Sequence, residues 1–224
     1  MSMLSNLELI RRVPLFALLT ANQAESVAES VTKRRFKRGE TIVEQGEKSN
    51  TLFIILTGRV RVVTSDKRGR EVILATLQPG DYIGEMSLID NQEHSATVRA
   101  EVQTDVLVLG RAEFARCLPE NSSMAYAIMK GLVQRLRQAD RKIESLALMD
   151  VYGRVARALL EFALPDREGL MTIKDRISRQ DIAKMVGASR EMVSRVMKDL
   201  EDRGFIETRQ DGSMLIKDRL STLG

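Results

Sequence analysis

Hydrophobic and polar positions follow different periodicities along the chain, and each periodicity predicts a different structure. From Lys33 to Leu109, short apolar runs alternate with glycine-containing turns. Many short strands with this punctuation predict a small β-barrel or jelly roll. No helix is expected there beyond a short turn that opens at Gly84 and Glu85. The expected strands are Thr41–Val43, Thr51–Thr57, Val60–Thr64, Glu71–Leu77, Thr97–Ala100 and Asp105–Gly110.

Helical patterns flank this β-rich stretch. Leu4–Ser30 is expected to form two helical pieces, the second over Ala21–Val31 with Thr20 or Asn22 as its cap. Asn121–Met149 is the longest uninterrupted helical pattern. Apolar residues three and four positions apart give it a coiled-coil seam, which favours pairing in a dimer; a helix packed on its own domain is the alternative. The seam consists of Met129, Leu132, Leu136, Ala139, Ile143 and Leu146.

Residues 178–204 predict two short helices with a tight turn between them. Ser178 suits the N-cap of the first helix, with Asp181 as its acidic partner. Gly187 suits the end of that helix, and Ser189 caps the second. This pattern predicts a helix-turn-helix, which places side chains of its second helix on base edges, although an ordinary helical corner shares the periodicity. The polar face of the second helix carries Arg190, Glu191, Ser194, Arg195 and Lys198.

Short strands are expected around these helices. Asp150–Leu164 predicts one more helix, and Met171–Ile173 predicts a strand. Phe205–Arg209 and Met214–Ile216 flank a hairpin turn at Gln210–Ser213. Helices followed by such a hairpin predict a winged helix-turn-helix.

Composition narrows the class of protein without deciding it. The 224 residues are 43% hydrophobic and 29% charged, typical of a globular protein, and no apolar run is long enough to span a membrane. The N-terminus lacks a secretory signal, so we expect a cytoplasmic protein. The net charge of +4 permits nucleic-acid binding without requiring it, because residues 151–224 hold only two more basic than acidic residues. A single cysteine, Cys117, excludes a disulfide framework and a cluster held by several cysteines.

Gly84–Ala100 contains a second candidate site. Main-chain N–H groups at the turn and the Ser95 hydroxyl could donate to a phosphate, and Glu85 could accept from a ribose hydroxyl. An ordinary turn without a ligand is the alternative reading of these residues.

Several segments resemble the CRP/FNR family of bacterial transcription regulators. They are SREMVSRVMKDLEDRGFI, FKRGETIVEQGE, LQPGDYIGEMSLI, SATVRA and LMDVYGRVARALL, and the resemblance extends over roughly Leu15–Ile216. It implies an α+β protein with a cyclic-nucleotide-binding-type jelly-roll barrel with N-terminal helices over 1–118, a dimerisation helix over 119–149 and a winged helix-turn-helix over 150–224. It also implies a homodimer that binds double-stranded DNA and RNA polymerase under the control of a small effector.

The resemblance assigns roles to particular residues. Arg190, Glu191 and Arg195 match the base-reading positions of members that recognise a TGTGA-type half-site, and arginine and glutamate suit guanine and cytosine edges. Phosphate contacts would come from Ser178, Arg179, Ser189 and Lys198. The implied effector site comprises Gly84, Glu85, Met86, His94, Ser95, Ala139 and Asp140.

The effector site departs from the family pattern at three positions. His94 stands where cyclic-AMP binders have a phosphate-binding arginine, and Ala139 and Asp140 stand where Thr and Ser are common. These changes argue against cyclic AMP bound in the usual geometry. Cyclic GMP, cyclic di-GMP or no ligand at all are the alternatives for the effector. For His94, the alternative is a surface-loop histidine without a role. With one cysteine and one histidine, neither an iron–sulfur cluster nor a haem is expected.

Two other classes of function make different predictions. No metal-ligand cluster, nucleophile elbow or phosphate loop is present in the sequence, so an enzyme is not expected. A sensor that acts through a protein partner would not show salt-dependent DNA binding, whereas a DNA-binding protein would.

Overall fold

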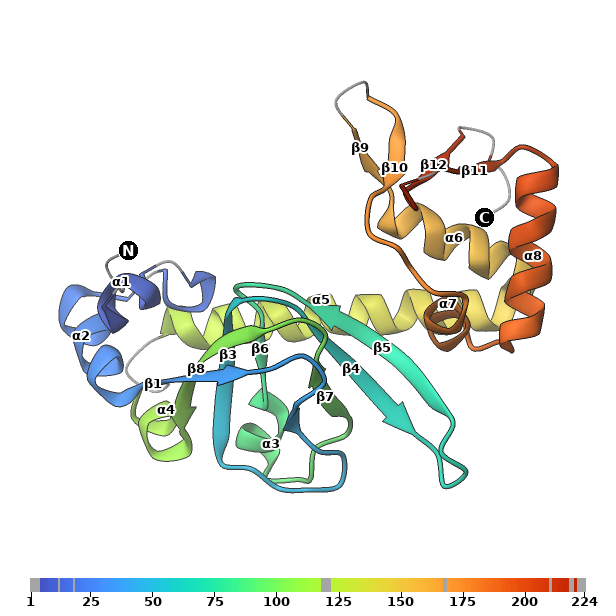
Figure 1. Ribbon diagram of the computed structural model, residues 1–224. Helices are drawn as coiled ribbons and strands as arrows, with labels where there is room; N and C mark the ends of the chain where they lie inside the picture. Colours follow the sequence, from blue (N-terminus) through green and yellow to red (C-terminus); the bar gives the residue numbers. More distant parts are fainter. Residues whose placement is uncertain are drawn as a thin grey trace. The chain divides into compact units, whose positions relative to one another are not determined.

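The chain folds into two compact units that divide between Arg135 and Leu136, inside the long helix α5 (Ser122–Leu148) (Figure 1). The computed structural model describes residues 5–11, 13–17, 19–117, 122–166, 169–209, 211–217 and 220. Leu4, Arg12, Leu18, Asn121 and Gln210 of the predicted elements lie outside these ranges. None of the described helices is long and apolar enough to cross a membrane.

The first unit contains the predicted β-barrel, made of two four-stranded antiparallel sheets with orders β1-β8-β3-β6 and β2-β7-β4-β5. All six predicted strands are confirmed to within one residue at either end. Apolar side chains between the sheets form the core, with Ile54, Ile55, Val60 and Val106 fully buried. The strands are β1 (Thr32–Phe36), β2 (Thr41–Val43), β3 (Thr51–Thr57), β4 (Val60–Ser65), β5 (Glu71–Leu77), β6 (Tyr82–Ile83), β7 (Thr97–Ala100) and β8 (Thr104–Gly110).

Two strands of the barrel were not predicted. β1 has the sequence TKRRF and only Phe36 is buried, so it lacks apolar alternation. It is a strand because it pairs with β8 over five residues, a long-range contact that local pattern does not reveal. β6 is only two residues long and pairs with β3.

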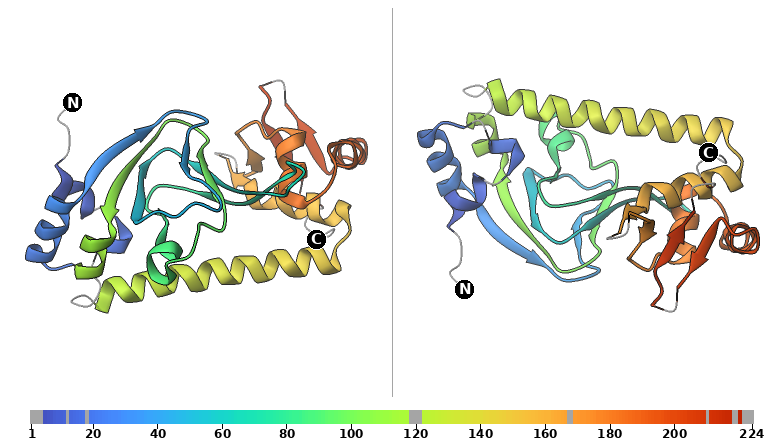
Figure 2. Two further views of the ribbon diagram at one scale, coloured as in Figure 1. Left: turned by 90° about the horizontal axis from the view of Figure 1, so that it is seen from below. Right: turned by 90° about the horizontal axis from the view of Figure 1, so that it is seen from above.

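Helices gather at one end of the barrel and on its side. The described pieces are α1 (Asn6–Ile10), a 3-10 helix (Pro14–Phe16), α2 (Ala21–Ser30), α3 (Glu85–Asp90) and α4 (Arg111–Cys117). Figure 2 shows α1, α2 and α4 together at the end of the barrel near β1 and β8. The cap of α2 is Thr20, whose hydroxyl accepts from the Gln23 N–H. α3 is the helical turn predicted at Gly84 and Glu85.

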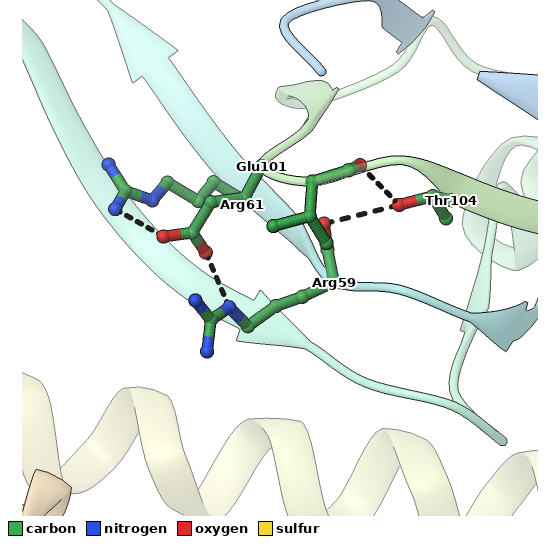
Figure 3. A network of polar contacts seen from close by, with 5 residues as sticks. Arg59, Arg61, Glu101 and Thr104 are labelled. Carbon is green, nitrogen blue, oxygen red and sulfur yellow. Dashed lines mark hydrogen bonds and ion pairs between the residues drawn. The ribbon is translucent and has the colours of Figure 1, made fainter. Parts of the chain in front are cut away.

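The turn between β7 and β8 is fastened to the start of β4. Glu101 accepts from Arg59 Nε at 2.8 Å and from the Arg61 guanidinium at 2.5 Å (Figure 3). The Thr104 hydroxyl donates to the carbonyl oxygens of Val102, at 2.9 Å, and Arg59, at 3.3 Å. Thr104 is completely buried, although Val102 and Gln103 beside it in the turn are exposed.

The second unit contains the predicted winged helix-turn-helix. Its elements are α6 (Val151–Phe162), β9 (Leu164–Pro165), β10 (Met171–Ile173), α7 (Arg179–Val186), α8 (Arg190–Asp202), β11 (Ile206–Thr208) and β12 (Met214–Ile216). The strands form one antiparallel sheet with order β11-β12-β10-β9. The predicted helix over Asp150–Leu164 was too long, because Leu164 and Pro165 pair with β10 instead. Three helices and the sheet enclose a core that includes Leu159, Ile182, Val193, Met197 and Leu200.

Candidate DNA interface and effector pocket

The two helices of the helix-turn-helix begin and end as their sequence predicts. The Ser178 hydroxyl accepts from the Asp181 N–H at 3.0 Å, and the Ser189 hydroxyl accepts from the Met192 N–H at 3.2 Å. Gly187 ends α7 in the left-handed conformation, with φ of 66°. Because Val193 and Met197 are fully buried, the rotation of α8 about its axis is fixed and its opposite face is exposed.

The predicted base-reading residues share that exposed face. Arg190, Glu191 and Arg195 are exposed, as are Ser178, Ser189 and Lys198, whereas Arg179 is half-buried. Hydrogen bonds from its own N–H and from Ser189, followed by the charges of Arg190 and Arg195, lower the pKa of Glu191. Glu191 therefore stays ionised near neutral pH and presents a hydrogen-bond acceptor beside two donors.

A pocket of about 600 Å³ adjoins the start of α8. Its polar wall includes Arg176, Arg179 and Arg190, together with the carboxylate of Asp175. Thr208 and Gly212 of the β11–β12 wing complete the rim, and Leu159 and Ile173 contribute to its apolar lining. Arg176 is not among the residues predicted from the sequence. A cation two residues before the helix cap was the only available signal.

In the predicted effector site, Glu85 is buried and already has a partner. Only 2% of Glu85 is exposed, and its carboxylate accepts from the Arg135 guanidinium of α5. Burial raises the pKa of Glu85, and the charge of Arg135 acts in the opposite direction. Arg135 is not among the predicted site residues, because nothing local in the sequence connects it to a residue fifty positions earlier.

His94 is also engaged within the barrel. Its Nε2 lies 2.8 Å from the Ser49 hydroxyl oxygen, and its main-chain N–H donates to the Glu47 carbonyl at 2.8 Å. It is buried, so the part of the alternative that placed His94 on the surface is wrong. Ser95 and Met86 are exposed. Among the described residues, no group of three or more His, Cys, Asp or Glu side chains could hold a metal ion.

The predicted seam of α5 divides between two environments. Leu132 packs partly against the barrel core. Met129, Leu136, Ile143 and Leu146 are between 49% and 64% exposed. Ala139 and Asp140, the two predicted effector-site residues on α5, are exposed on the part of the helix that belongs to the second unit.

Comparisons with known proteins identify the family. Residues 33–121 match the cyclic nucleotide-binding domain, and residues 153–220 match the Crp-like helix-turn-helix domain. The cAMP-activated global transcriptional regulator Vfr of Pseudomonas aeruginosa is 39% identical over 185 residues, which cover 79% of this chain and 86% of Vfr. The chain belongs to the CRP/FNR family of transcription regulators.

Other members of the CRP/FNR family agree with this assignment. CRP of Salmonella typhimurium is 38% identical over 178 residues, covering 77% of this chain and 83% of that protein. The solved structure of the c-di-GMP responsive global regulator CLP of Xanthomonas campestris matches with a TM-score of 0.75 and 26% identity, covering 88% of this chain and 98% of CLP. The predicted fold class is confirmed, and these relatives are transcription regulators rather than enzymes.

The burial of His94 makes the folding stability of this CRP/FNR member depend on pH. Burial lowers the pKa of His94, and Glu47 acts in the opposite direction. Above about pH 6.5 the imidazole is neutral in both the folded and unfolded states. Below that pH the unfolded chain binds a proton that the folded barrel does not, so stability is lost as the pH falls.

We expect the stability advantage of the wild type over a His94→Gln variant to shrink between about pH 7.5 and about pH 5.5. Urea unfolding of both proteins at each pH measures it. Glu85 is present in both proteins, so its contribution to the pH dependence of stability cancels in the comparison. An advantage that stays constant or grows in acid would contradict the assigned direction.

Proposed function

We propose that this protein is a homodimeric, sequence-specific transcription regulator that reads a TGTGA-type palindrome. The observation that carries the proposal is the joint exposure of Arg190, Glu191 and Arg195 on one face of a helix whose other face is buried. Arginine pairs with guanine O6 and N7, and a glutamate carboxylate accepts from cytosine N4. Ser178, Arg179, Ser189 and Lys198 would contact phosphates and position the helix.

Two copies of the chain are needed to read a palindrome. Helix-turn-helix dimers place their recognition helices on half-sites one helical turn apart. Large apolar side chains exposed along α5 support α5 as the dimer contact, because such a stripe is costly to leave in water. Bound DNA would then be presented to RNA polymerase, the expected protein partner.

The effector is proposed to be a cyclic nucleotide held in the barrel. The matched cyclic nucleotide-binding domain supports this class, as do relatives described as cAMP-activated and c-di-GMP responsive. Which nucleotide binds is a separate question, because His94 replaces an expected arginine. A constitutive regulator with an unused pocket is the second candidate, favoured by the internal partners of Glu85 and His94. DNA binding with and without cyclic AMP, cyclic GMP and cyclic di-GMP distinguishes the two candidates.

The Glu191→Ala variant tests direct base readout. We expect it to reduce preference for the matching base pair by about tenfold per half-site, within the 1–3 kcal/mol of a good base contact. Competition between TGTGA-type and singly substituted duplexes at fixed salt measures the preference. Lys198→Ala is the control, since loss of a phosphate contact weakens all duplexes alike. If Glu191→Ala leaves the preference unchanged, the readout assignment is wrong.

A further inference from the structure

Helix α8 leaves one large apolar side chain exposed to solvent. Val193, Met197 and Leu200 are fully buried in the core of the second unit, and Val196 packs against that core. Met192 is the remaining apolar residue of the helix, and it is 41% exposed. The other exposed residues of α8 are charged or carry a hydroxyl group; they are Arg190, Glu191, Ser194, Arg195, Lys198, Asp199 and Asp202.

The position of Met192 makes this exposure informative, whereas a single exposed apolar side chain is in itself ordinary. Met192 is the third residue of α8, and its main-chain N–H donates to the Ser189 hydroxyl at 3.2 Å. It follows Glu191 directly and precedes Arg195 by three positions, and residues three apart are neighbours on a helix surface. Helix-turn-helix proteins contact base edges from this N-terminal part of their second helix. Met192 therefore lies beside two of the residues proposed to read bases.

The packing of α8 determines where the Met192 side chain can be covered. Because Val193 and Met197 are fully buried, the helix cannot rotate to bury Met192 in its own domain. Helical side chains lean toward the N-terminus of their helix, so Met192 covers the turn that contains Ser189. Removal of its apolar surface from water is favourable. On this part of α8, the surface that would cover it is the major groove of bound DNA.

The major groove offers a methionine one kind of apolar partner. Thymine presents a C5-methyl group there, whereas the edges of adenine, guanine and cytosine are distinguished by hydrogen-bond donors and acceptors. A thioether has no donor and is only a weak acceptor, so it cannot satisfy those groups. Its unbranched and flexible chain adapts well to an apolar contact. The chemistry of Met192 therefore favours thymine over the other bases.

We propose that Met192 is a specificity-determining residue that reads the methyl group of a thymine in the half-site. The inference rests on the proposed function, because a TGTGA-type half-site contains thymine on both strands. Arg190, Glu191 and Arg195 are assigned to guanine and cytosine edges, so they do not recognise thymine directly. Met192 supplies the apolar contact that does.

Deoxyuridine in place of thymidine tests this contact, because uracil lacks only the methyl group. Each thymine of the TGTGA-type palindrome is replaced in turn, in both half-sites. Affinity is measured by fluorescence anisotropy at fixed salt, in the one condition (cyclic AMP, cyclic GMP, cyclic di-GMP or no nucleotide) that gives the tightest binding by the wild type. At one thymine position we expect the uracil duplex to bind the wild type about fourfold more weakly per half-site, or about fifteenfold on the palindrome, the effect of one buried methyl group.

The Met192→Ala variant should lose this discrimination. It is expected to bind the thymine and uracil duplexes about equally, because the methyl group and the methionine contribute to the same contact. Met192→Leu keeps an apolar side chain of similar volume and should retain most of the discrimination. Lys198→Ala is the control, since loss of a phosphate contact weakens binding to both duplexes alike. Thermal unfolding checks that the three variants fold.

The outcomes separate the Met192 contact from the proposed function. If the wild type prefers the palindrome to singly substituted duplexes but never distinguishes thymine from uracil, the contact is overturned and the function stands. If Met192→Ala retains the full discrimination, another residue contacts the methyl group, and the contact is overturned as well. If the wild type shows no preference for the palindrome, the proposed function fails and the contact fails with it.

Discussion

Replacement of Gly58 by alanine is expected to lower the free energy of unfolding by about 3 kcal/mol, one of the largest effects of any single methyl group in this chain. Gly58 connects β3 to β4 with φ of +90°, a conformation that side chains rarely adopt. An added Cβ would lie 2.5 Å from the Gln103 carbonyl oxygen and 2.7 Å from the Thr104 Cα. Both are main-chain atoms in the corner where the Thr104 hydroxyl donates to the Arg59 carbonyl oxygen (Figure 3). Neither can therefore move without disturbing that hydrogen bond.

Gly69→Ala is the matched control for this prediction. Gly69 also has a positive φ, +74°, but no atom lies within 4 Å of its added Cβ. The Gly69→Ala substitution should lower the free energy of unfolding only by the backbone strain, about 1 kcal/mol. Urea unfolding midpoints of both variants and the wild type measure the difference. Equal losses would show that the β3–β4 corner relaxes, contrary to the packing described above.

Features encoded by neighbouring residues could be predicted from the sequence. The caps at Ser178 and Ser189 depend on hydrogen bonds to residues three positions away, so a short sequence window contains both partners. The six predicted strands show apolar runs bounded by turns. β1 could not be found in this way, because four of its five side chains are exposed and its partners in β8 lie about seventy residues further along the chain.

The two candidate sites differ in the same respect. The residues proposed to read DNA lie on one helix, so helical periodicity alone places them on one face. The proposed effector pocket is built from segments far apart in the chain. Its acid was predicted, but the partner that neutralises it, Arg135, comes from another helix and requires the fold to be known. His94 was chosen for its position relative to Ser95, yet its contacts are with the loop that contains Ser49 and Glu47.

Arg190→Ala should produce the largest loss of DNA affinity. One bidentate arginine–guanine pair contributes about 1–3 kcal/mol, and each subunit of the proposed dimer makes one, so we expect a loss of about 2–6 kcal/mol on the full palindrome. Fluorescence anisotropy with labelled duplex at fixed salt measures it. Arg203→Ala is the control, because Arg203 carries the same charge at the opposite end of α8 and is half-exposed.

Binding to the full palindrome and to a single half-site shows whether both subunits of the proposed dimer contribute to the loss of affinity caused by Arg190→Ala. On a duplex with one intact half-site, one subunit reads bases and the other contacts only the backbone. The loss caused by Arg190→Ala, in free energy, should then be about half of that on the palindrome, since contacts to separate half-sites are roughly additive. Arg203→Ala should shift both duplexes by a similar, smaller amount that disappears with added salt. An equal loss from Arg190→Ala on both duplexes would mean that a single recognition helix supplies the base readout, and the proposed two-fold reading of the palindrome would be wrong.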